Sequence, residues 1–112
     1  MKTRTKTLTI CLSLALALSA CGEQESANDY LIQAQNFSKE SQYKESVVAL
    51  KNAARLAPDD SEIRFLLGQA YLSLGNALDA VKELERAQSL NYQGGKLLPS
   101  LARAYLIAND DN

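Results

Sequence analysis

The chain has 112 residues and a formal net charge of −1, and it contains two cysteines and no histidine. The absence of histidine excludes imidazole general bases and Cys/His zinc sites. A mildly acidic chain without a basic run is a poor nucleic-acid binder, so we expect no nucleic-acid partner.

The amino end has the pattern of a secretory signal. Lys2, Arg4 and Lys6 form a basic start, and residues 8–20 carry no charge and are mostly Leu and Ala. This apolar run is shorter than the roughly 20 residues that a transmembrane helix needs. A basic start, a short apolar core and small residues at its end predict a cleaved signal peptide over residues 1–20.

The predicted signal ends in the residues Leu18-Ser19-Ala20-Cys21-Gly22, which resemble the lipobox of bacterial lipoproteins. The resemblance implies that diacylglycerol is transferred to the sulfur of Cys21 and that cleavage follows Ala20. Two or more acyl chains hold a protein stably at a membrane, whereas one chain holds it only marginally. The alternative is an ordinary signal peptide in which Cys21 falls by chance.

The mature chain is then a lipid-anchored protein of the cell envelope. Removal of residues 1–20 with their three basic residues leaves 92 residues and a formal charge of −4. Lipidation of Cys21 leaves no thiol for a disulfide or for nucleophilic catalysis. Gly22 is not Asp, which by the lipoprotein sorting rule of enterobacteria implies the outer membrane, facing the periplasm. Residues 21–27 are interpreted as the lipidated cysteine and a short tether.

The remaining sequence is helical in pattern, because apolar residues recur at spacings of three and four. The pattern breaks at Ser41-Gln42, 57–60, Gly75-Asn76 and 91–95. We predict five helices, over residues 28–40, 43–57, 61–74, 77–90 and 96–108. Asp60 is the expected N-cap of the third helix, with Glu62 favourably placed in its first turn. Gly75 is expected to adopt a left-handed C-cap conformation.

The helical segments repeat when the chain is shifted by 34 residues. The shift aligns the apolar stripe of the second predicted helix with that of the fourth: Val47 with Val81, Leu50 with Leu84, Ala53 with Ala87 and Leu56 with Leu90. Two positions keep the same kind of side chain in all three copies. One is aromatic, Phe37/Tyr71/Tyr105, and the other is small, Ala34/Gly68/Ala102. Matching apolar stripes indicate that the copies pack in the same way.

A 34-residue pair of antiparallel helices resembles the tetratricopeptide repeat, or TPR. The motif is carried by Leu67-Gly68, Tyr71, Gly75, Ala80, Leu84 and Ala87. The resemblance implies an all-α, antiparallel helix-pair solenoid of about two and a half repeats, over residues 28–60, 61–94 and 95–112. Arg64 and Tyr92 depart from the family, which prefers Trp and Pro there. A five-helix bundle without repeats is the alternative.

The third copy contains only the first helix of a pair. Such a helix leaves one apolar face uncovered, including Leu101, Ala104, Tyr105 and Ala108. We therefore expect either that the sequence is the beginning of a longer protein or that the fifth helix pairs with another copy of the chain.

No group of residues predicts catalysis, a metal site, a small-molecule substrate or a cofactor other than the covalent lipid. The cluster of Asp59, Asp60 and Glu62 is explained by helix capping. Gly94-Gly95 lacks the context of a phosphate-binding loop. Glu83 and Arg86 are expected to form an i,i+3 pair on a solvated face.

Repeats of this kind usually bind partners in the concave groove lined by the first helix of each pair. The matching positions include Leu31, Gln35 and Ser38, then Phe65, Gln69 and Leu72, and then Arg103 and Leu106. Gln35, Gln69 and Arg103 form one column that can hold the backbone or carboxylates of an extended peptide, while Phe65 and Leu72 supply apolar contact. We expect Gln69→Ala combined with Phe65→Ala to weaken capture without lowering the melting temperature. The alternative is a merely solvated helix face.

The lipobox together with the segments 43–53, 62–72 and 97–104 is similar to the start of the TPR-repeat lipoproteins of the PEP-CTERM/exosortase system. The resemblance implies a membrane-tethered, non-enzymatic scaffold that binds other envelope proteins or peptides and supports protein sorting and exopolysaccharide export. One alternative is a TPR assembly lipoprotein for outer-membrane protein insertion or pilus secretin biogenesis. Another is the adaptor region of a longer enzyme.

Overall fold

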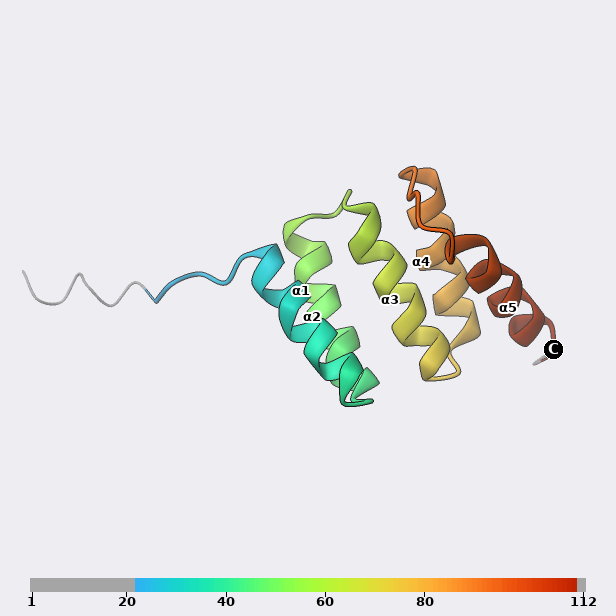
Figure 1. The fold of residues 1–112 in the computed structure, drawn as a ribbon, viewed down its shortest axis with the longest axis horizontal. Coiled ribbons are helices and arrows are strands. Elements are labelled where there is room, and N and C mark those ends of the chain that lie inside the picture. Colours follow the sequence, from blue (N-terminus) through green and yellow to red (C-terminus); the bar gives the residue numbers. More distant parts are fainter. Residues whose placement is uncertain (1–21, 111–112) are drawn as a thin grey trace, which may run out of the picture.

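A computed structural model describes residues 22–110, which form five α-helices joined by short turns (Figure 1). The helices are α1 (Ala27–Lys39), α2 (Tyr43–Leu56), α3 (Ser61–Ser73), α4 (Ala77–Ser89) and α5 (Leu97–Asp110). The described residues contain no strand, and every helix ends within two residues of its predicted boundary. The all-α prediction is confirmed, whereas the predicted signal peptide and Cys21 lie outside the described residues.

The helices pack as consecutive antiparallel pairs. The main contacts join α1 to α2 and α3 to α4, and smaller ones join α2 to α3 and α4 to α5. Figure 1 shows the helices side by side in chain order, with α5 at the end of the row. Each helix therefore contacts chiefly its neighbours in the chain, as in a helical solenoid. The predicted helix-pair solenoid is confirmed.

The core follows the repeated apolar stripes. Leu50 of α2 is 1% exposed and Leu84 of α4 is 0% exposed. Gly68 lets α3 approach α4 closely, because a Cβ at this position would lie 2.6 Å from Cγ of Leu84. Gly68 and Leu84 both stand at positions that the 34-residue repeat conserves in character, and they face each other between the two helices of the pair.

Three helices end in the same left-handed turn. Ser41, Gly75 and Asn91 follow α1, α3 and α4 with φ of 59°, 76° and 60°. After α1, the N–H of Gln42 donates to the carbonyl of Phe37 at 2.8 Å, and equivalent bonds close the other two turns at 2.9 and 3.0 Å. These are Schellman motifs, which satisfy carbonyls at the helix end. The prediction for Gly75 is confirmed, and the chain uses the same geometry twice without glycine.

Side chains cap the starts of α1 and α3. The carboxylate of Asp60 accepts the N–H groups of Glu62 and Ile63 at 3.0 and 3.1 Å, so the predicted N-cap is confirmed. At α1, the hydroxyl of Ser26 accepts the N–H of Asp29, whose carboxylate accepts the N–H of Ser26. This capping box starts α1 at Ala27, one residue before the predicted start.

Candidate functional site

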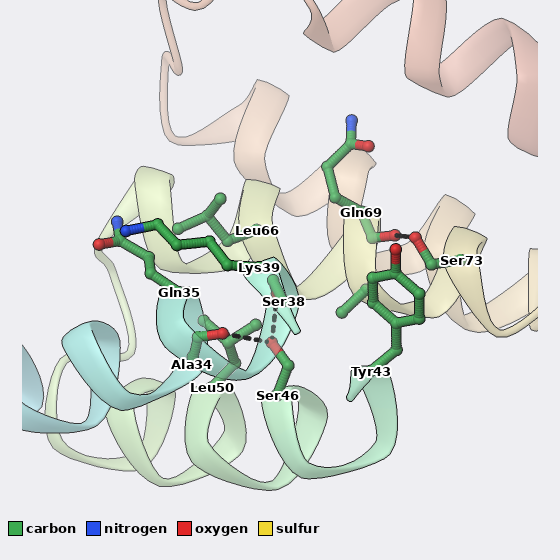
Figure 2. Close-up of a pocket in the computed structure, with 11 residues that line it drawn as sticks. Ala34, Gln35, Ser38, Lys39, Tyr43, Ser46, Leu50, Leu66, Gln69 and Ser73 are labelled. Atoms are coloured by element: carbon green, nitrogen blue, oxygen red, sulfur yellow. Dashed lines mark hydrogen bonds between the residues drawn. The ribbon is translucent and has the colours of Figure 1, made fainter. Parts of the chain in front are cut away.

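A cleft of about 290 Å³ opens between the first three helices. We call it the α1–α3 cleft. Its lining comes from α1, α2 and the second half of α3: Ala34, Gln35, Ser38, Lys39, Tyr43, Ser46, Leu50, Leu66, Gln69, Ala70 and Ser73. Figure 2 shows that these residues come from three neighbouring helices. The cleft therefore spans the junction between the first and second helix pairs.

Hydrogen bonds between α1 and α2 fix the floor of the cleft. The hydroxyl of Ser46 is 0% exposed and donates to the carbonyl of Ala34 at 3.0 Å. It also lies 2.8 Å from the hydroxyl of Ser38, and both contacts are drawn in Figure 2. Because Ser46 bonds two residues one turn apart, it sets the spacing of α1 and α2 beneath the cleft. The cleft is thus built on a fixed base.

The rim of the cleft carries exposed polar side chains. Gln35 and Lys39 lie one turn apart on α1, and both are exposed. In Figure 2 their side chains extend to the same side of the cleft, opposite the ring of Tyr43. Lys39 is the one charged residue in the described lining. The cleft thus combines an apolar floor with an amide, hydroxyls and an ammonium group, which suits a polar chain segment with small apolar side chains.

The cleft brings together three of the residues that the sequence placed in the groove. Gln35, Ser38 and Gln69 all line it. The side-chain N–H₂ of Gln69 also donates to the hydroxyl of Ser100 on α5, so this amide connects the second helix pair to α5. Leu31 is half-buried and Arg103 is exposed, and neither lines the cleft. Partner binding by these residues stays a prediction.

Phe65 and Leu72 are not open to a partner. They are 6% and 4% exposed, because both belong to the packed core of the described residues. The ring of Phe65 stacks on Tyr92, with centroids 4.4 Å apart and an angle of 12° between the planes. The expectation that these two side chains form exposed apolar contacts is therefore corrected. Phe65→Ala should cost about 3–5 kcal/mol of stability through the cavity that it leaves, so it would lower the melting temperature.

Residues 37–94 match the tetratricopeptide repeat family. The chain belongs to the tetratricopeptide repeat family. No curated protein matches the chain. TPR proteins are interaction scaffolds, and their all-helical fold is typically not enzymatic. Within residues 22–110, no cluster of three or more His, Cys, Asp or Glu side chains could hold a metal ion. No helix in that range combines the length and apolar content that crossing a membrane requires.

Arg64 takes the position where TPR sequences prefer Trp, and it connects three parts of the repeat. Two of its guanidinium nitrogens donate to the carbonyl of Pro58 at 3.1 and 3.0 Å. A third donates to the carboxylate of Glu83 on α4 at 3.0 Å. The expected Glu83–Arg86 pair is wrong, because Arg86 instead pairs with Asp59 at 2.9 Å. The guanidinium group of Arg64 thus links the two helices of the TPR at the position where the family usually packs the indole ring of Trp.

Tyr92 takes the position where TPR sequences prefer Pro. Its ring covers Phe65 and also passes over Gly94, where an added Cβ would clash with the ring carbons of Tyr92. Burial raises the pKa of the Tyr92 hydroxyl, and the nearby charge of Glu62 adds to the shift. Gly94 is therefore explained by packing against Tyr92.

The sequence prediction missed the contribution of α2 to the cleft. It placed the groove on the first helices of each pair alone, and so left out Tyr43, Ser46 and Leu50. One signal was present: Ser46 interrupts an apolar stripe at the position where the second repeat has Ala80. A hydroxyl at a core position needs a hydrogen-bond partner, and that partner is the α1 backbone under the cleft.

Proposed function

We propose that this TPR protein is a lipid-anchored scaffold of the bacterial envelope that holds an extended segment of a partner protein in the α1–α3 cleft. The observation that carries the proposal is the cleft itself, a preformed hollow of about 290 Å³ with an apolar floor and a polar rim. Pockets of this kind are usually preformed and use a few polar groups to fix the orientation of what they bind.

The rim supports binding of a peptide segment. The Gln35 amide has both donors and an acceptor, so it can pair with the N–H and C=O groups of an extended backbone. Lys39 is a flexible cation in a lining without a carboxylate. The proposed partner segment is therefore neutral or acidic.

The proposed lipid anchor on Cys21 would hold the cleft close to a membrane. The lipobox resemblance puts the acyl chains on Cys21, and α1 begins at Ala27. The five residues 22–26 span at most about 18 Å when fully extended. The cleft would thus face partners at the periplasmic side of the outer membrane. Cys21→Ser should abolish labelling by radioactive palmitate, and continued labelling would contradict the proposed anchor.

The resemblance to TPR lipoproteins of the PEP-CTERM/exosortase system supports a more specific role. We propose that the scaffold supports protein sorting and exopolysaccharide export in bacteria with an exosortase. The partners are then envelope proteins of that system, and the chain itself catalyses no step.

The cleft can be tested with a variant that changes only its exposed rim. We expect Gln35→Ala combined with Lys39→Ala to reduce partner capture at least tenfold, measured by cross-linking in cells that express the full chain. The melting temperature should stay unchanged, because both side chains are exposed.

The matched control replaces the same residue types away from the cleft. Lys82→Ala combined with Gln88→Ala changes two exposed residues of α4 and should leave capture unchanged. Equal capture by the wild type and the Gln35/Lys39 variant would contradict the proposed site.

A further inference from the structure

The outer face of α5 exposes a row of apolar side chains. Leu98 is 66%, Tyr105 49% and Leu106 70% exposed, and Leu78 of α4 is 74% exposed. Leu78 shares a hollow with Tyr105, Leu106 and Ala102. We call these five residues the α5 face. Contiguous exposed apolar surface of this kind commonly marks an interaction site.

The equivalent face of α3 in the preceding repeat is covered by a helix. The α3 residues that align with Ala102, Tyr105 and Leu106 are Gly68, Tyr71 and Leu72. All three are buried, with Tyr71 8% and Leu72 4% exposed, and α4 packs against α3. The α5 face therefore has the residue pattern of a surface that accepts a helix, and no helix within residues 22–110 covers it.

We propose that the α5 face binds the α5 face of a second copy of this chain, with the two helices antiparallel about a two-fold axis. The charges at the two ends of α5 favour this occupant. Lys96 precedes the helix and Asp110 ends it, and both signs are unfavourable for the dipole of their own helix. An antiparallel pair brings Lys96 of each copy to Asp110 of the other. It also opposes the two helix dipoles, whereas a parallel pair would place like charges together.

The amino end of the solenoid disfavours a head-to-tail contact. The α3 positions that meet the preceding repeat are apolar, whereas the equivalent positions of α1 are mostly polar: Asp29, Ile32, Gln33 and Asn36. Burying the leucines of α5 against this surface would desolvate a carboxylate and amides. The contact therefore closes as a two-fold dimer and does not extend into a filament.

The contact area makes this a weak dimer in solution. A helix of 14 residues is about 21 Å long, so the pairing of two such helices falls short of a standard interface. Tethering both copies to one membrane raises their effective concentration. That enhancement rests on the proposed lipid anchor, but the pairing of the two helices does not.

Cysteine cross-linking in the full chain tests both the contact and its direction. An antiparallel pair centred on the stripe from Leu98 to Asn109 offsets the two Ala102 residues by about 5 Å along the helix axis, and the two Leu98 residues by about 17 Å. Under mild oxidation in membranes, Ala102→Cys should form a disulfide-linked dimer at least tenfold more efficiently than Leu98→Cys. The wild-type chain gives the background, because its two cysteines are Cys11 and Cys21.

Several results would overturn the proposal. Equal linking at both positions indicates a parallel pair or random collision, and linking at neither position indicates no contact. A disulfide adduct between the Ala102→Cys chain and a different protein would show another occupant.

Charge variants of the Ala102→Cys chain test the pairing of Lys96 with Asp110 of the other copy. Asp110→Lys should reduce cross-linking several-fold, and adding Lys96→Asp should restore it. Failure of the double variant to recover would contradict the antiparallel pairing. Cys21→Ser should lower the total yield without changing the ratio between positions 102 and 98. A failed anchor and a failed dimer are therefore distinguishable.

Discussion

At the residue scale, the three left-handed turns show how one backbone geometry accepts different side chains. Gly75 adopts positive φ without steric cost, and Asn tolerates this conformation better than most residues. Ser41 has neither advantage, although it occupies the position of Gly75 in the preceding repeat. The first repeat therefore holds strain that the second avoids.

We predict that Ser41→Gly stabilises the protein by about 0.5–1 kcal/mol, because relief of left-handed strain exceeds the entropy cost of glycine. Gly75→Ser should destabilise it by a similar amount. Thermal unfolding followed by circular dichroism measures both changes. A lower melting temperature for Ser41→Gly would show that the Ser41 side chain stabilises the turn in a way that the backbone geometry does not reveal.

The sequence predicted some single-residue roles and missed others for a physical reason. The cap of Asp60 and the turn at Gly75 depend on neighbours within a few residues, so local chemistry was enough to predict them. The bonds of Ser46 and Arg64 reach residues 12 and 19 positions away. Their partners become known only when the helices pack.

At the element scale, the α3–α4 pair is held by Arg64 as well as by its apolar core. The side chains of Arg64 and Glu83 are only 20% and 13% exposed, so solvent screens their ion pair less than a surface pair. Arg86 and Asp59 form a comparison pair that is 48% and 75% exposed. The stabilising effect of the Arg64–Glu83 pair between α3 and α4 can therefore be compared with that of the more exposed Arg86–Asp59 pair.

We predict that Arg64→Lys destabilises the protein by about 1.5–3 kcal/mol, because lysine cannot reproduce the bonds to Pro58 and Glu83 together. Arg86→Lys should change stability by less than about 1 kcal/mol. Urea unfolding of both variants measures the difference. Equal effects would mean that the hydrogen bonds of Arg64 contribute no more to stability than an ordinary surface charge.

The start of α1 should respond to acid. Hydrogen bonds from the side chain and then the backbone of Ser26 lower the pKa of Asp29 from its ordinary value of 3.8. A lowered folded-state pKa contributes stability that is present above the unfolded value and is lost as the pH falls through the folded value.

We therefore predict that the first turn of α1 frays below about pH 4, near the unfolded carboxyl pKa. The protection of the amides at residues 29–31, measured against the intrinsic exchange rate at each pH, should fall there, and Ser26→Ala should weaken this dependence on pH. Protection at α1 that stays constant from pH 6 to pH 3 would contradict the role of the capping box.

At the scale of the whole molecule, the fold was more predictable than the site. The 34-residue shift repeats the contacts between neighbouring helices, so the solenoid follows from a pattern within the chain. The cleft depends on how two helix pairs meet. That packing buries Phe65 and Leu72, directs Gln69 toward Ser100, and leaves Gln35 exposed.

The two ends of the solenoid also differ in character. The amino end is polar and is joined to the proposed anchor, whereas the carboxyl end presents the α5 face. The α1–α3 cleft lies in the half nearer the anchor. In the proposed arrangement, partner capture near the membrane is separate from the proposed pairing of copies at the far end.

Site-specific photo-cross-linking in cells determines whether the α1–α3 cleft holds a partner. A photoreactive residue at Ser73 lies in the cleft lining, and one at Val48 lies on α2 outside it with 61% exposure. If the cleft holds a partner, position 73 gives a discrete adduct with one partner protein, and this adduct disappears in the Gln35→Ala/Lys39→Ala variant. Position 48 gives no adduct. The same adduct from both positions, or one that persists in the rim variant, would contradict binding in the cleft.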